Sequence, residues 1–272
     1  MFPSFKNILI PVDFTINTEV AINKTLELID HEGSVIHLLH VNTEIVGFGQ
    51  KRRRLWHKKL NQWRETIKDY YAGVSVHLWS VRSLSVQKAI TEKALQIGAD
   101  CVVIGQTSAH KWLPVLKTVL PLRLAVSTNI PVLTVKPGSL YTRPKTVVVP
   151  IADELTDIKV NALKLLCYKT RLNVHLVTFV NGGNIPPDES ASALLKVYQS
   201  LKTKLRCPVE YSVINGRNKA KALLQYAEKK NADILLVYPK EETQLGFWNI
   251  HITDVLPADS KMQILAVRPT IT

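Results

Sequence analysis

The sequence repeats itself, and this repetition constrains the fold more than any other feature. Segment 6–12 (KNILIPV) matches 145–151 (KTVVVPI) without a gap. Three further pairs follow in the same order: 35–41 with 174–180, 98–104 (GADCVVI) with 231–237 (NADILLV), and 130–137 with 262–269. Repetition over a long period indicates repeated structural units. We therefore predict two domains of one fold, residues 1–140 and 141–272, which meet where Pro, Gly and Ser interrupt the pattern at 137–144.

Short runs rich in Val and Ile, apolar at consecutive positions, alternate with segments of helical period in both copies. Such runs are typical of strands buried on both faces of a parallel sheet. The sequence therefore predicts an α/β fold with two tandem Rossmann-like domains, each a five-stranded parallel sheet flanked by helices. The expected strands are 7–12, 35–41, 74–79, 101–105 and 131–135, then 146–151, 173–180, 208–214, 233–238 and 263–267.

Basic residues outnumber acidic ones, 35 to 22, for a net charge of +13. The excess is spread over both halves, so the chain has no dedicated basic tail. One local run, at 51–54 (KRRR) and 57–59 (HKK), has helical period with apolar positions between. It is either a reader of anionic surfaces or a solvated helix face. Because no nucleic-acid recognition motif accompanies it, we do not expect a nucleic-acid partner.

Cys101, Cys167 and Cys207 are widely spaced, which is not the pattern of a disulfide framework or a zinc site. Cys101 and Cys167 lie in apolar periodic segments, where buried thiols are expected. A reducing cytoplasm is the compartment that fits this usage. No apolar run approaches the roughly 20 residues of a membrane span, and the N-terminus does not resemble a signal peptide.

Open parallel sheets bind ligands beyond the carboxyl ends of their strands, near the point where strand order reverses. That rule directs attention to Asp13, Val41 and the loop after Gly105. An acid placed like Asp13 either accepts ribose hydroxyls or caps the following helix, and both interpretations stay open.

The segments 8–13 (ILIPVD), 98–105 (GADCVVIG) and 130–135 (IPVLTV) resemble the universal stress protein family. The resemblance covers nearly the whole chain as two tandem copies. It implies domains that pair side by side through their last strands. In this chain the pairing would join the two copies to each other, through segments near 132–135 and 264–267.

Family members that bind ATP carry a phosphate loop of the form Gly, two residues, Gly, nine residues, Gly, then Ser or Thr. Glycines let the backbone approach phosphates, and the hydroxyl adds a donor. Here Ser108 replaces the second glycine, Lys117 replaces the third, and the spacing is one residue shorter. Either Lys117, Lys111 and His110 supply charge in place of backbone donors, or the loop binds nothing. The resemblance marks these positions as cofactor-binding candidates for ATP: Pro11, Asp13, Val41, Gly105, Ser108, Lys117, Thr118 and Val119.

The second copy departs further from that pattern. Tyr238 and Pro239 stand where glycine is needed, and the carboxylates of Glu241 and Glu242 follow. Pro lacks an N–H group and the acids repel phosphate, so no nucleotide is expected in this copy. His251 and Asp254 lie three apart but have no third ligand, so no metal site is expected.

The sequence contains no recognised catalytic motif, and enzymatic activity is the least supported class. The first functional hypothesis is a tandem stress-response module with a regulatory or protein-interaction role, an unknown protein partner, and weak or absent nucleotide binding. The alternative is an ATP-binding stress sensor that uses the first domain and its altered phosphate loop.

Overall fold

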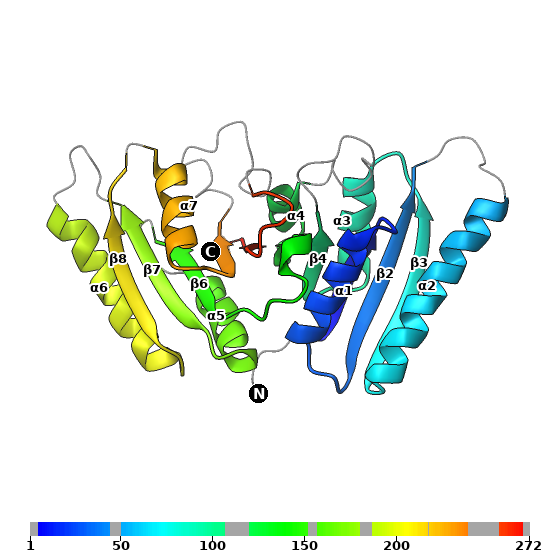
Figure 1. Cartoon of the computed structure of the whole chain (residues 1–272), viewed down its shortest axis with the longest axis horizontal. Coiled ribbons are helices and arrows are strands. Elements are labelled where there is room, and N and C mark those ends of the chain that lie inside the picture. The colour runs from blue at the N-terminus through cyan, green and yellow to red at the C-terminus, as the bar shows by residue number, and fades with distance from the viewer. Residues whose placement is uncertain are drawn as a thin grey trace.

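A computed structural model describes residues 5–43, 50–106, 120–151, 157–179, 187–216, 218–238 and 256–268. Within these ranges the strands form one continuous sheet with helices on both faces (Figure 1). The first half contributes β1 (Asn7–Val12), α1 (Ile16–Leu28), β2 (Ser34–Asn42), α2 (Gln50–Tyr70), β3 (Val74–Arg82), α3 (Val86–Gln96), β4 (Cys101–Gly105), α4 (Pro121–Thr128) and β5 (Val132–Val135). The second half contributes β6 (Thr146–Pro150), α5 (Asp157–Lys169), β7 (Asn173–Phe179), α6 (Pro187–Lys204), β8 (Val209–Ile214), α7 (Lys219–Lys229), β9 (Ile234–Val237) and β10 (Gln263–Ala266).

The strand order is β3-β2-β1-β4-β5-β10-β9-β6-β7-β8. The second half therefore repeats the strand order of the first in the reverse direction, starting from the β5–β10 junction. Strands within each half pair in parallel, whereas β5 and β10 pair antiparallel, with Leu133 opposite Leu265. The prediction that the copies join through their last strands is confirmed. Each half thereby covers an apolar edge that the other would leave open to solvent.

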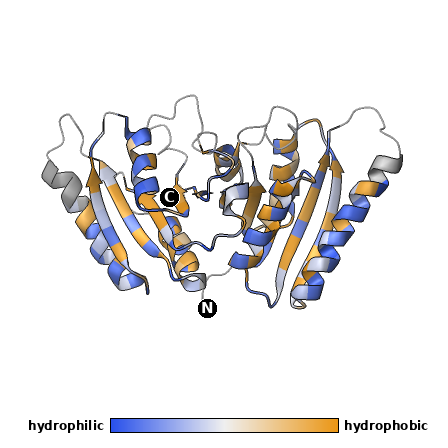
Figure 2. Ribbon diagram, viewed as in Figure 1, coloured by the Kyte–Doolittle hydropathy of each residue, from blue (hydrophilic) through white to orange (hydrophobic). Residues whose placement is uncertain are grey.

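Two helical layers enclose the sheet. Helices α1, α2, α5 and α6 contribute to one apolar cluster, which runs across both halves, while α3, α4 and α7 contribute to the other. Figure 2 shows hydrophobic strands between helices whose outer faces are hydrophilic. The α/β fold with two tandem halves, expected from apolar runs alternating with helical segments, is confirmed.

The repeated Ala-Asp pattern at 99–100 and 232–233 has a structural cause in both halves. Gly98 and Asn231 adopt left-handed backbone (φ 60° and 51°), which ends α3 and α7. The following Asp100 then accepts the backbone N–H groups of Lys6 and Asn7, at 3.0 and 2.9 Å. Asp233 does the same at the start of β6, at 2.8 and 3.1 Å. In each half, one carboxylate thus ties the turn that follows α3 or α7 to the start of the first strand of that half.

The connection between the halves begins with a short 3-10 helix, η1 (Pro137–Ser139). Gly138 lies so close to the second half that a Cβ atom there would stand 1.9 Å from the carbonyl oxygen of Asp259. From the first half, the buried ammonium of Lys24 donates to the carbonyl of Thr142. The connection is therefore packed against both halves, and the domain boundary at residue 140 stays a prediction.

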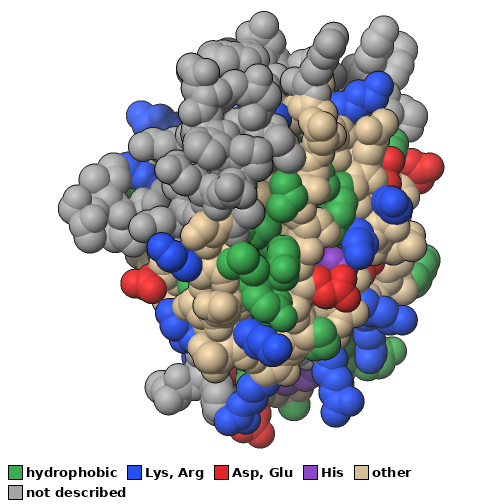
Figure 3. All heavy atoms as spheres, turned by 90° about the vertical axis from the view of Figure 1, so that its left-hand side faces the viewer, with side chains coloured by type: hydrophobic (Ala, Val, Ile, Leu, Met, Phe, Trp, Pro, Cys, Tyr) green, Lys and Arg blue, Asp and Glu red, His purple; other side chains and the backbone are tan. Residues whose placement is uncertain are grey.

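Strands β3 and β8 form the two ends of the sheet. Figure 3 faces the end formed by α6 and β8, where hydrophobic side chains gather and Lys and Arg surround them. Tyr211 and Val213 of β8 are each 45% exposed on this edge. Charged residues around the apolar group restrict pairing of this edge with another chain.

Candidate functional site

Four of the predicted site residues lie at one edge of the first half. Pro11 is in β1, Asp13 follows it, Val41 is near the end of β2 and Gly105 ends β4. Because β1 lies between β2 and β4, the carboxyl ends of these parallel strands meet there. The other four candidates, Ser108, Lys117, Thr118 and Val119, fall outside the described residues.

The carboxylate of Asp13 is held by the first turn of α1. Its Oδ1 accepts the backbone N–H and the hydroxyl of Thr15, at 3.0 and 2.7 Å, and the hydroxyl of Thr18, at 2.9 Å. Its Oδ2 accepts the side-chain amide of Asn17 at 3.0 Å. A carboxylate has about four acceptor positions, about two on each oxygen. Three donors crowd Oδ1, whereas Oδ2 accepts one and keeps one position. Only that position on Oδ2 is left for a ribose hydroxyl. The N-cap of α1 is Thr15, whose hydroxyl accepts the Asn17 N–H at 3.2 Å, and Asp13 holds this cap in place through its contacts with Thr15.

Phe14 builds an aromatic cluster beside this cap. Its backbone is left-handed (φ 61°), which directs the ring toward α2. There it stacks on Trp56 and Trp63 at centroid distances of 5.8 and 5.9 Å, and His40 meets it edge-on at 4.8 Å. Lys59 donates to the Phe14 carbonyl at 3.0 Å. A bulky residue tolerates positive φ only when its surroundings hold it there, and these rings and Lys59 supply that support.

Gly105 has a packing role that does not involve a ligand. A Cβ atom at this position would lie 1.9 Å from the carbonyl oxygen of Asn17, in the first turn of α1. The end of β4 and the start of α1 therefore approach more closely than any side chain allows. The absence of a side chain here is explained by contact between two elements of the chain itself.

Two histidines near this region are held neutral. Burial lowers the pKa of His40 and of His37 to about 4 each. His37 bridges two side chains, because Nε2 lies 2.7 Å from the Asn7 amide oxygen and Nδ1 accepts the indole N–H of Trp79 at 2.9 Å. The His37 ring therefore donates at Nε2 and accepts at Nδ1, and it serves as a packed structural residue of β2.

The corresponding position in the second half is filled by side chains. Tyr238, which aligns with Gly105, is 7% exposed. The ammonium of Lys159 lies 3.9 Å from the centroid of its ring and donates to the carbonyl of Pro150 at 2.9 Å. An aromatic ring and a buried cation therefore occupy the strand ends of β6 and β9. The remaining residues of the altered loop lie outside the described residues: Pro239, Lys240, Glu241 and Glu242.

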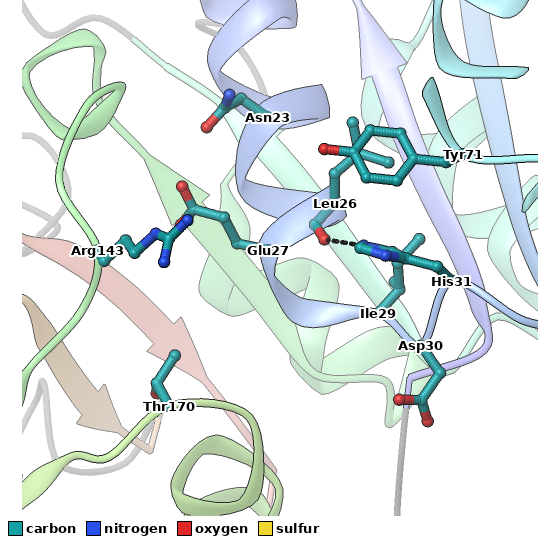
Figure 4. Close-up of a pocket in the computed structure, with 9 residues that line it drawn as sticks. All are labelled: Asn23, Leu26, Glu27, Ile29, Asp30, His31, Tyr71, Arg143 and Thr170. Carbon is teal, nitrogen blue, oxygen red and sulfur yellow. Dashed lines mark hydrogen bonds between the residues drawn. The ribbon is translucent and has the colours of Figure 1, made fainter. Parts of the chain in front are cut away.

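A cavity lies at the opposite edge of the sheet, where the parallel strands begin, at the seam between the halves (Figure 4). Its volume is about 540 Å³. Figure 4 shows Glu27 and Arg143 facing the same space, with Tyr71 and His31 on the other side. The full lining is Asn23, Leu26, Glu27, Ile29, Asp30, His31, Tyr71, Arg143 and Thr170.

The chemistry of this seam cavity is mixed. The Glu27 carboxylate already accepts two bonds from the Lys24 ammonium, both at 3.0 Å, and His31 donates to the carbonyl of Leu26. Arg143 and Asp30 add one charge of each sign. Charge therefore favours neither an anion nor a cation. No sequence signal indicates this cavity, because its lining comes from separate segments of both halves.

Within the described ranges, no three His, Cys, Asp or Glu side chains gather as a metal site requires. His251 and Asp254, the pair singled out in the sequence, lie outside those ranges. A search of the same residues finds no helix with the length and apolar character needed to cross a membrane.

The sequence pattern of the Universal stress protein family matches residues 4–136, which span the first half from before β1 through β5. The first half of the chain belongs to the universal stress protein family. A comparison with curated proteins finds no significant match.

Solved structures extend the likeness of this universal stress protein to its second half. A universal stress protein from Archaeoglobus fulgidus DSM 4304 is 13% identical, with a TM-score of 0.67 over 96% of this chain and 98% of that one. The cytoplasmic domain of a prokaryotic cation chloride cotransporter is also 13% identical, with a TM-score of 0.61 over 97% and 96%. At such identities the likeness shows a shared fold, and it covers both halves in tandem.

Proposed function

We propose that this tandem universal stress protein acts as a regulatory or protein-interaction module in the stress response, with weak or absent nucleotide binding. The observation that carries the proposal is the carboxylate of Asp13, whose oxygens accept four hydrogen bonds from the chain itself. In the resemblance drawn above, this residue would bind ribose. With these donors in place, only one acceptor position, on Oδ2, is left for the two hydroxyls of a ribose.

The surroundings of Asp13 support the same conclusion. Phe14, Trp56, Trp63 and His40 form a ring cluster that packs β1 and β2 against α2. The small space lined by His40, Trp56, His57, Leu60 and Ser80 measures about 10 Å³, which is room for about one water molecule. An adenine base does not enter this space without rearranging the rings.

In the second half, Tyr238 and Lys159 fill the equivalent strand ends. We infer that this half serves as the structural partner of the first, since β10 closes the edge of β5. A tandem fold of this shape also forms the cytoplasmic domain of a cotransporter.

The alternative, an ATP-binding sensor, draws on one specific observation. Pro11, Asp13, Val41 and Gly105 do converge at the carboxyl ends of β1, β2 and β4, where open parallel sheets bind ligands. In this alternative Ser108, Lys117, Thr118 and Val119 would complete the phosphate side. Lys117 would then have to replace backbone donors by direct charge pairing.

One experiment separates the two functions. The purified full chain is denatured and the released small molecules are analysed by mass spectrometry for adenine nucleotide. The refolded or freshly purified protein is also titrated calorimetrically with magnesium-ATP, alongside Lys117→Ala. We expect no stoichiometric nucleotide and no saturable heat in either protein. Micromolar affinity in the wild type that is lost in Lys117→Ala would establish the sensor and overturn the proposal.

A further inference from the structure

Two of the three cysteines meet in the second half, although 40 residues separate them in the sequence. The Sγ atoms of Cys167, in the last turns of α5, and Cys207, between α6 and β8, lie 2.6 Å apart. A disulfide holds its sulfur atoms about 2.05 Å apart, so closing the bond needs little movement. Spacing along the sequence did not suggest this pair, because only the fold brings α5 beside the entry to β8.

The environment of the two thiols differs from that of Cys101. Cys167 and Cys207 are partly buried at the margin of the apolar cluster under α5 and α6. Cys101 is fully buried in β4, and burial raises the pKa of its thiol to about 12. The chain thus contains one adjacent, partly accessible thiol pair and one enclosed thiol of low reactivity.

We propose that Cys167 and Cys207 are a modification site, at which a hydroperoxide converts the two thiols to an intramolecular disulfide that a dithiol reduces again. The pair lies in the second half, away from the strand ends of the first. The proposal therefore stands or falls independently of nucleotide binding.

The two thiols share a hydrogen bond in which either sulfur can be the donor. The thiolate is the nucleophile in such reactions, so the sulfur that ionises attacks the peroxide and the other, within bonding reach, is the resolving thiol. The hydrogen bond lowers the pKa of Cys207 and raises the pKa of Cys167, which favours Cys207 as the attacking sulfur.

The reaction balances with hydrogen peroxide as the oxidant. The Cys207 thiolate attacks one peroxide oxygen, the O–O bond breaks, and the second oxygen leaves as water after protonation, which gives a sulfenic acid. The sulfur of Cys167 then attacks that sulfenic sulfur and loses its proton. The S–O bond breaks, and a second water leaves. Two thiols are oxidised to a disulfide while one peroxide is reduced to two waters.

Closure of this bond would link the end of α5 to the segment that enters β8, the edge strand of the sheet. The closed loop contains β7 and α6. Cross-links that close long loops restrict the unfolded chain. We therefore expect the oxidised protein to melt at a higher temperature, and α6 to be cleaved more slowly by protease than in the reduced protein.

The test uses the folded full chain. Reduced protein is treated with hydrogen peroxide, alkylated with N-ethylmaleimide under native conditions, digested and mapped by mass spectrometry without reductant. We expect a peptide pair joined through Cys167 and Cys207, which dithiothreitol separates, while Cys101 stays a free thiol that reacts only after unfolding.

Matched variants complete the design. Cys101→Ser should keep the cross-link at wild-type yield, whereas Cys167→Ser and Cys207→Ser should abolish it. The wild-type map alone decides the proposal if a variant fails to fold. Peroxide-treated wild type in which both thiols remain alkylatable, or in which Cys207 advances to sulfinic acid without a cross-link, would overturn the assignment. A cross-link through Cys101 or between two chains would overturn it as well.

Discussion

Replacing Asp13 by alanine tests whether this carboxylate stabilises the N-terminus of α1 or accepts a ligand. The substitution removes every acceptor that binds the Thr15 backbone and the side chains of Thr15, Asn17 and Thr18. Thr18 is fully buried and Asn17 is 7% exposed, so water does not readily replace the lost partner at those two donors. The Thr15 donors are partly exposed and can turn to solvent.

The magnitude follows from the two buried donors. A buried donor left without a partner costs about 1–3 kcal/mol, and loss of a negative charge at a helix N-terminus costs about 0.5 kcal/mol more. Because Asp13 itself is only partly buried, we expect a loss of unfolding free energy in the lower half of the range that these contributions add up to, about 3 kcal/mol. For a chain of this size that lowers the melting temperature by roughly 6–12 °C.

Two control variants provide stability losses to compare with that of Asp13→Ala. Asp13→Asn keeps an oxygen that can accept from Thr15 and Thr18 but presents an amide to Asn17, so we expect a loss of about 1 kcal/mol. Glu19→Ala removes an exposed acid from the same first turn of α1, which should change stability by less than about 0.5 kcal/mol. Urea unfolding followed by circular dichroism measures all three variants against the wild type.

One pattern of results would refute the reasoning. If Asp13→Ala unfolds at the wild-type midpoint, the carboxylate does not stabilise the N-terminus of α1 as its contacts indicate. If, in addition, magnesium-ATP raises the melting temperature of the wild type but not of Asp13→Ala, the residue is a nucleotide ligand. The expected result is a large stability loss and no effect of ATP on either protein.

Three further predictions concern packing and pH. Gly105→Ala should cost more than about 3 kcal/mol, because the new methyl group meets the Asn17 carbonyl; a stable variant by differential scanning fluorimetry would contradict the close approach. Leu265→Ala, at the junction of the halves, should cost about 3 kcal/mol through the cavity it leaves, and a shift below about 1 kcal/mol in urea unfolding would show that β10 contributes little. Stability should also fall as pH drops from 6.5 toward 4, because the unfolded chain protonates His37 and His40 at their ordinary pKa of 6.5 while the folded protein holds both near 4. Each ring should account for about 1–2 kcal/mol after solvent screening, and unfolding midpoints that do not change between pH 7 and 4.5 would contradict the buried neutral state.

Much of the fold follows from the sequence because its signals are local and repeated. Runs of Val and Ile mark strands buried on both faces, and every expected strand overlaps an observed one. The third strand extends to Arg82, beyond its predicted end at 79, because β3 is an edge strand whose half-exposed residues no longer read as an apolar run. Pairing of the last strands was also predictable, since two apolar edges in one chain need cover.

The sequence predicts where the candidate site lies but not which role its residues have. Asp13 and Gly105 fall where the strand-end rule places them, yet the sequence leaves two explanations open for Asp13 and does not indicate the packing role of Gly105. The contacts separate them: Asp13 binds the first turn of α1, and Gly105 admits the carbonyl of Asn17. No signal in the sequence indicates that the rings of Trp56 and Trp63 meet Phe14, because α2 and β1 are remote in the chain.

The repeat, the strands and the family thus follow from the sequence alone, because they depend on which residues are apolar and at what period. Three features depend on the tertiary structure: the hydrogen bonds of Asp13, the filling of the second-half strand ends by Tyr238 and Lys159, and the contact of Cys167 with Cys207. Hydrogen bonds and thiol reactivity act over distances of a few ångströms. Only the packing of helices on the sheet determines which side chains from separate segments come within that range.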